Sequence, residues 1–242
     1  MGKLIVLIVS IFCTQLSFLK DDTMVNMHAN IAGEYIVTDT TIPKSFLALG
    51  DSYTIGEAVL FSEKFPVQTV QYLRQQGINF SEPEIIAKTG WTTANLLNAL
   101  ADAAPSKKSY DIVTLLIGVN NQYQHQSQQQ YAEEFLILLN KAIQYAGNNK
   151  KRVIVLSIPD YSVTPFASGT DKALIAREID AFNTINKAIA EQAGVNYLDI
   201  TGYTRMAVAD ATLLATDGLH PSGLEYKIWS DTLLPVIKVA LQ

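Results

Sequence analysis

Five short, mainly apolar runs separated by helical patterns limit most strongly how this chain can fold. The runs lie at residues 46–49, 84–87, 112–117, 153–158 and 195–200. A strand without a polar face is typical of a sheet that is covered on both sides. Helical patterns lie at about 63–76, 93–103, 129–146 and 171–193, and a last helix begins after Pro221-Ser222. This alternation predicts an α/β fold with a parallel sheet and right-handed crossovers.

Four polar segments lie just after these predicted strands or just before a predicted helix, where ligands usually bind. Gly50-Asp51-Ser52-Tyr53, Thr89-Gly90-Trp91 and Gly118-Val119-Asn120-Asn121 each follow one of the first three apolar runs. The fourth segment, 217–222, lies in the last loop before a helix and reads Asp-Gly-Leu-His-Pro-Ser. Sites in parallel sheets form at the carboxyl ends of the strands. We therefore expect the segments to meet at one edge of the sheet.

Ser52 is the candidate nucleophile among these residues. A serine on a strand-to-loop turn can expose its hydroxyl above the sheet, and its own N–H can face a developing oxyanion. The alternative is a turn or N-cap serine, which is common beside Gly and Asp.

His220 and Asp217 are the candidate base and orienting carboxylate. They are three residues apart in one loop, so the carboxylate can fix the tautomer of the imidazole that accepts the serine proton. The alternative is a helix-capping loop in which Asp217 makes a turn and Ser222 caps the helix. The other histidines, His28 and His125, lie in polar stretches and are expected to be solvated.

Asn120 and Gly90 are candidate oxyanion donors. A side-chain amide after the third strand could donate to the oxyanion, and glycine lets a backbone N–H approach a ligand closely. Ordinary turn residues remain the alternative for both.

Together the four segments resemble the sequence blocks of the SGNH hydrolases, also called GDSL-type esterases and lipases. The family's Ser, Gly, Asn and His blocks match Gly50-Asp51-Ser52, Gly90, Gly118-x-Asn120 and Asp217-x-x-His220 in the same order, over about residues 45–235. The resemblance implies a flavodoxin-like three-layer sandwich with a five-stranded parallel sheet of order 2-1-3-4-5.

The resemblance also implies a role for each matched residue. Ser52 would be the nucleophile, His220 the base and Asp217 its partner. The N–H groups of Ser52 and Gly90 and the Asn120 amide would form the oxyanion hole. Two departures are visible. Asn121 stands where the family commonly has Asp, which puts local hydrogen bonding in doubt, and Tyr53 stands where many members have Leu.

Aromatic residues near the strand ends are candidates for substrate binding. Trp91, Tyr123, Tyr161 and Phe166 could line an acyl site, and Tyr53 could shape its floor. Pockets are usually lined by such side chains, although ordinary loop packing would look the same in the sequence.

The predicted function is a serine hydrolase of carboxylic esters, acting on a small-molecule, glycan or lipid ester. A carbohydrate O-acetyl esterase or an acyltransferase of the same fold is an alternative, and a non-catalytic binding module is one from a different class. A nucleotide site is not expected because the first strand is followed by neither glycine pattern that holds phosphates. No metal-ligand spacing occurs, so neither a metal nor a cofactor is expected. The net charge of −5 argues against nucleic acid as a partner.

The N-terminus predicts export. Lys3 followed by the apolar run 4–13 resembles a signal peptide, so residues 1–22 are expected to be a signal peptide or anchor. Residues 23–43 are expected to be a lead-in or linker, and residues 44–242 the hydrolase domain. The product would be periplasmic, secreted or membrane-anchored. A cytoplasmic protein that starts at Met24 or Met27 is the alternative. Cys13 is the only cysteine, which excludes an intrachain disulfide.

Overall fold

The computed structural model describes residues 17–20, 23–29, 35–39 and 42–242, and the chain divides into two units after Pro43. In the first unit, strands β1 (Ser17–Lys20), β2 (Thr23–Ala29) and β3 (Tyr35–Asp39) form an antiparallel sheet in that order. Strands β2 and β3 thus occupy much of the predicted linker, where β-branched residues that favour strands interrupt the polar pattern.

The expectations about export rest mainly on the first residues of the chain. The signal peptide or anchor predicted for residues 1–22 falls largely outside the described residues, and it stays a prediction together with the localisation. Among the described residues, no helix combines the length and apolar character that crossing a membrane requires.

The second unit is built on a five-stranded parallel sheet. Its strands pair in the order β5-β4-β6-β7-β8, which confirms the predicted order 2-1-3-4-5. Each strand lies within the run predicted for it or extends it by one residue. Their bounds are β4 Phe46–Gly50, β5 Glu84–Ala87, β6 Ile112–Leu116, β7 Val153–Leu156 and β8 Asn196–Leu198.

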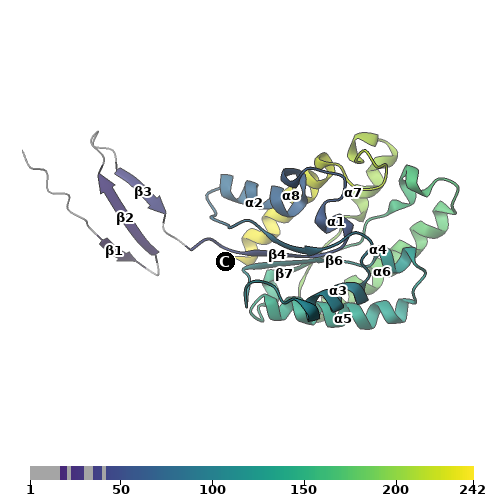
Figure 1. The fold of residues 1–242 in the computed structure, drawn as a ribbon, viewed down its shortest axis with the longest axis horizontal. Coiled ribbons are helices and arrows are strands. Elements are labelled where there is room, and N and C mark those ends of the chain that lie inside the picture. The colour runs from purple at the N-terminus through teal and green to yellow at the C-terminus, as the bar shows by residue number, and fades with distance from the viewer. Residues whose placement is uncertain (1–16, 21–22, 30–34, 40–41) are drawn as a thin grey trace, which may run out of the picture. The chain divides into compact units, whose positions relative to one another are not determined.

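Long helices cover both faces of this sheet, as predicted. In Figure 1, α2 and α8 lie on one side of the sheet, and α3 and α5 lie on the other. Helix α6 packs beside α5. The bounds of these helices are α2 Phe65–Gln75, α3 Thr93–Asp102, α5 Gln128–Tyr145, α6 Lys172–Ala193 and α8 Gly223–Ala240.

Within residues 42–242, short helical turns fill the connections between the strands and long helices. The sequence does not predict them because a single turn is too short to show a helical period. Three are α-helical: α1 Ser52–Ile55, α4 Val119–Tyr123 and α7 Thr201–Arg205. Six are 3₁₀ turns: η1 Phe61–Glu63, η2 Lys150–Arg152, η3 Tyr161–Val163, η4 Pro165–Ala167, η5 Met206–Val208 and η6 Ala211–Leu213.

Buried aromatic side chains fix the helices against the sheet. Strands β4, β6 and β7 are buried throughout. On the α8 side, Phe65 of α2 meets Trp229 with ring centroids 5.9 Å apart. On the opposite side, Tyr131 of α5 meets Phe182 of α6 at 4.7 Å. Burial of each such ring stabilises the fold by about 1.5–3 kcal/mol, so the sheet edge that follows these strands is a rigid platform.

Candidate active site

The first three polar segments leave the sheet at the same edge. Gly50 at the end of β4 is paired in register with Ala87 of β5 and Leu116 of β6. A Cβ atom at Gly50 would lie 2.3 Å from the Leu116 carbonyl oxygen, so only glycine allows the two strand ends to approach this closely. The residues that follow these strands are therefore brought together.

Ser52 is the first residue of α1. Asp51 is the N-cap, and its Oδ1 accepts a hydrogen bond from the Tyr53 N–H at 3.0 Å, which fixes the start of the turn. The N–H groups of Ser52 and Gly90 make no hydrogen bond within the described residues. Gly90 has a φ of +80°, a conformation that favours glycine. Both N–H groups are thus free to donate to a ligand.

His220 and Asp217 form a close pair within the loop before α8. His220 Nδ1 lies 2.6 Å from Asp217 Oδ2. Asp217 Oδ1 accepts hydrogen bonds from the backbone N–H groups of Leu219 and His220, each at 3.0 Å. Partial burial acts to raise the pKa of Asp217, but these hydrogen bonds outweigh it and hold the pKa below its usual value. The carboxylate therefore stays ionised and keeps a proton on Nδ1, which leaves Nε2 as the basic atom.

Asn120 connects two of the predicted segments. Gly118, two residues earlier, has a φ of +135°, and a Cβ there would collide with the Tyr131 ring at 2.6 Å. The Asn120 side-chain amide donates to the Trp91 carbonyl at 3.0 Å. An amide nitrogen carries two hydrogens, so one remains for another acceptor.

Asn121, the departure noted in the third segment, is fully buried and well paired. Its Oδ1 accepts from the Thr93 N–H at 3.1 Å. Its Nδ2 donates to Thr93 Oγ1 at 2.6 Å and to Gln126 Oε1 at 2.8 Å. The amide therefore ties the end of β6 to the start of α3, and the doubt about local hydrogen bonding is resolved.

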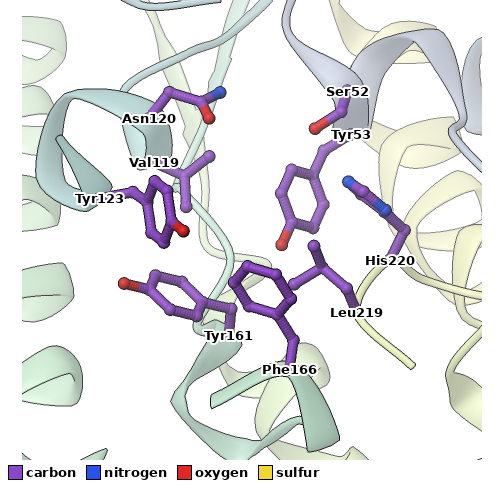
Figure 2. A pocket seen from close by; sticks show the side chains of 9 residues that line it. All are labelled: Ser52, Tyr53, Val119, Asn120, Tyr123, Tyr161, Phe166, Leu219 and His220. Carbon is purple, nitrogen blue, oxygen red and sulfur yellow. The ribbon is translucent and has the colours of Figure 1, made fainter. Parts of the chain in front are cut away.

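A cavity of about 80 Å³ brings most of the predicted residues together. Figure 2 shows Ser52 and Asn120 pointing toward each other across it, with His220 on the Ser52 side. The predicted residues Tyr53, Tyr123, Tyr161 and Phe166 also line it, together with Val119 and Leu219, which were not predicted as lining residues. Val119 and Leu219 both belong to the matched segments, and in the sequence only their neighbours Asn120 and His220 indicate that they lie near the site.

Trp91 and Gly90 lie outside the lining of this cavity. The Trp91 side chain is half-buried against the hydrophobic core, and its backbone carbonyl accepts the hydrogen bond from the Asn120 amide. The Trp91 side chain does not line this cavity, and the substrate-binding role predicted for it stays a prediction. Gly90 is exposed, and its role stays a prediction.

Aromatic rings surround the rest of the cavity. The rings of Tyr123, Tyr161 and Phe166 form a triangle with centroids 5.9–6.1 Å apart. Tyr123 is 51% exposed and Phe166 47%, so they form a rim that solvent can reach. The Tyr53 ring packs against the His220 imidazole at a centroid distance of 4.9 Å. No hydrogen bond joins Ser52 to His220 among the described residues, and such bonds often tighten only when substrate is bound.

Two further carboxyl groups are buried near this site. Burial raises the pKa of Asp51 to about 7, despite hydrogen bonds from the backbone that oppose the shift. Burial likewise raises the pKa of Glu225 to about 7, and the hydrogen bond from Trp229 Nε1 opposes it only in part. Both groups are therefore largely protonated in the folded protein at mildly acidic pH.

These two carboxyls should make the folded protein less stable as the pH rises. Above about pH 4 the unfolded chain loses both protons, whereas the folded protein holds them until about pH 7. Between pH 5 and 7.5 we expect the free energy of unfolding to fall by up to about 3 kcal/mol per group. Urea titrations at several pH values measure this. Glu225→Gln should make the free energy of unfolding depend less on pH, whereas Glu133→Gln on the exposed face of α5 should not. An equal dependence on pH in the wild type and both variants would contradict the expectation.

No group of His, Cys, Asp and Glu side chains able to hold a metal ion occurs in the part of the chain that the structure describes. The expectation of no metal and no cofactor stays a prediction.

Comparison with known proteins places the chain in a family. The model of the GDSL-like lipase/acylhydrolase family matches residues 48–228. None of the curated proteins matches the chain significantly by sequence.

Solved structures share the fold. TesA superposes with a TM-score of 0.63 at 19% identity, covering 82% of this chain and 100% of TesA. Axe2, an acetylxylan esterase from Geobacillus stearothermophilus, gives 0.60 at 19% identity, covering 80% and 94%. A lipase/acylhydrolase from Enterococcus faecalis gives 0.60 at 19% identity, covering 82% and 97%. At this identity the likeness concerns the fold. The family match covers most of the chain, which therefore belongs to the GDSL-like lipase/acylhydrolase family and is a serine hydrolase of carboxylic esters.

Proposed function

We propose that Ser52 is the nucleophile of this esterase, that His220 is its base and that Asp217 orients the histidine. One observation carries the proposal: Ser52 and His220 line the same cavity, and His220 is held by a carboxylate 2.6 Å from Nδ1. A neutral imidazole whose Nδ1 is fixed in this way presents a basic Nε2 to the serine hydroxyl.

The reaction then follows two steps. Ser52 Oγ attacks the ester carbonyl while His220 Nε2 takes its proton, and the same nitrogen returns that proton to the leaving alcohol. Water next attacks the acyl-enzyme while His220 takes its proton; His220 then returns this proton to Ser52 Oγ as the bond to the acyl group breaks and the carboxylic acid leaves. Transfer of the acyl group to an alcohol in place of water would use the same residues, and identification of the product separates the two reactions.

The oxyanion of each tetrahedral intermediate would be held by three donors. The free N–H groups of Ser52 and Gly90 and the second hydrogen of the Asn120 amide are suited to this role. Asn120 faces Ser52 across the cavity (Figure 2). Fixed donors of this kind lower the barrier because they need no reorganisation when the charge develops.

Asn120→Ala should therefore lower kcat for p-nitrophenyl acetate by about 100- to 1,000-fold with a small change in KM. Initial rates over a range of substrate concentrations measure both constants. Gln124→Ala, at the exposed C-cap of the same short helix, is the matched control and should behave like the wild type. A kcat for Asn120→Ala within a factor of three of the wild type would leave Asn120 as a turn residue.

The cavity size favours a short acyl group. A volume of about 80 Å³ is far below the roughly 300–1,000 Å³ of sites that enclose drug-sized ligands. Release of p-nitrophenol from acetyl, butyryl and octanoyl esters tests this, and acetate should be the preferred ester. Absence of hydrolysis of all three would contradict the proposed function.

A second candidate is the removal of acetyl groups from carbohydrates. The same small cavity supports it, as does the exposed aromatic rim formed by Tyr123 and Phe166. Acetylxylan esterases are among the proteins of similar fold. Release of acetate from acetylated xylan, compared with that from simple alkyl acetates, distinguishes the two candidates.

A further inference from the structure

A larger apolar groove lies next to the small cavity. The segment 161–166 contributes to both: Tyr161 and Phe166 line the cavity, whereas Ser162 to Pro165 line the groove. The groove has a volume of about 630 Å³. Lys172 is the one charged residue in its lining, and most of the others are apolar: Val163, Pro165, Ala207, Val208, Ala211 and Leu214.

Apolar side chains around the groove are unusually exposed. Val208 is 74% exposed and Met206 50%, both in η5. Leu174, next to the lining residue Ala173, is 43% exposed. Single exposed apolar residues are ordinary, but a group of them around an apolar groove indicates a binding surface.

The walls of the groove are attached to the loop that carries His220. Leu214 in the groove forms a β-bridge with Pro221, and the Ala215 N–H donates to the His220 carbonyl at 2.8 Å. Next to the groove residue Pro165, the N–H of Phe166 donates to the carbonyl of Gly218 at 3.3 Å. These contacts connect the groove to the loop that carries His220.

The chemistry of the proposed reaction decides which part of an ester lies there. His220 must return its proton to the oxygen of the leaving alcohol, so the alcohol lies on the histidine side. The acyl carbonyl faces the donors around Asn120, and the small cavity can enclose only a short acyl group. We propose that the groove binds an apolar alkyl chain on the alcohol part of the substrate, an inference that rests on the proposed function. The preferred substrates are then short-acyl esters of long-chain alcohols.

Acetate esters of linear alcohols test this proposal. In the wild type, kcat/KM should rise with the length of the alcohol, by up to about four-fold for each methylene that enters the groove. The ratio of kcat/KM for octyl acetate to that for ethyl acetate should be on the order of 100, because several methylenes are buried. The rate of acetic acid release, measured at concentrations below the solubility limit of each ester, gives kcat/KM for that ester.

Two matched variants separate the groove from general effects. Ala211→Trp places an indole in the groove and should reduce the octyl-to-ethyl ratio to near 1. Ala209→Trp adds the same group two residues away, outside the groove lining, and should keep the wild-type ratio. Because each ratio is taken within one protein, partial loss of folded enzyme does not alter it. A flat wild-type series, or an unchanged ratio in Ala211→Trp, would overturn the proposal.

A binding measurement distinguishes failure of this proposal from failure of the proposed function. Calorimetry with 1-octanol and the Ser52→Ala protein needs no turnover, and it should detect binding that Ala211→Trp removes. Octanol binding without hydrolysis of any ester would support the groove and contradict the esterase mechanism. Hydrolysis of ethyl acetate without octanol binding would overturn the groove alone.

Discussion

Ser52→Ala is expected to reduce ester hydrolysis by about four to six orders of magnitude while leaving the fold intact. Ser52 carries the only aliphatic hydroxyl in the cavity lining, so no neighbouring alcohol can replace it as the nucleophile. The residual rate would come from the oxyanion donors and the held substrate alone. Hydrolysis of p-nitrophenyl acetate, with enzyme concentrations high enough to detect slow turnover, measures the loss.

The fold should tolerate this substitution because the Ser52 side chain makes no hydrogen bond within the described residues. The start of α1 is held by Asp51, whose carboxylate accepts from the Tyr53 N–H. We therefore expect a change in unfolding free energy within about 0.5 kcal/mol. Ser109→Ala, an exposed serine before β6, is the control and should keep full activity. Activity of Ser52→Ala within ten-fold of the wild type would show that another residue is the nucleophile.

The sheet could be predicted from the sequence because its strands carry an unusually clear signal. The runs that became β4, β6 and β7 are apolar on both faces and are flanked by long amphipathic helices. Strands that are buried on both faces show no alternation of polar and apolar residues, and the right-handed crossover between parallel strands then leaves few possible topologies. The short helices α1 and α4 could not be predicted because they are set by capping and by the glycines that precede them, not by a period.

The site could be predicted to the level of its polar residues. Ser52, Asn120 and His220 follow strand ends or precede a helix, so the fold itself brings them to one edge. The directions of apolar side chains were harder to foresee. Trp91 and Leu219 both pack partly against the core, but only Leu219 also lines the cavity, although both stand next to a matched residue.

The groove beside the site had no sequence signature for a related reason. Its walls come from two separate stretches of the chain, one from η3 to the start of α6 and the other from η5 to Leu214. Small residues such as Ala207 and Ala211 form a groove only because those segments lie beside one another. Spatial proximity of this kind depends on loop conformation, which composition and periodicity do not determine.

Asp217→Asn should lower kcat by about three to four orders of magnitude although the loop keeps its shape. The asparagine Oδ1 can still accept the hydrogen bonds from the Leu219 and His220 N–H groups. Its amide nitrogen, however, would stand where Oδ2 now lies 2.6 Å from His220 Nδ1. An amide donates there, so Nδ1 would have to accept, and the imidazole proton would move to Nε2. Nε2 could then no longer take the proton of Ser52.

The charge lost in this variant matters as well, because the ionised carboxylate stabilises the imidazolium that forms during each step. Asp210→Asn is the matched control: it removes a carboxylate that, within the described residues, bonds Thr212 alone at the preceding 3₁₀ turn, and it should keep nearly full activity. The kcat values of both variants show whether Asp217 orients His220 for the reaction or only shapes the loop. If Asp217→Asn retained more than a tenth of the wild-type kcat, the carboxylate would serve only to shape the loop, and His220 would be oriented by its packing against Tyr53 instead.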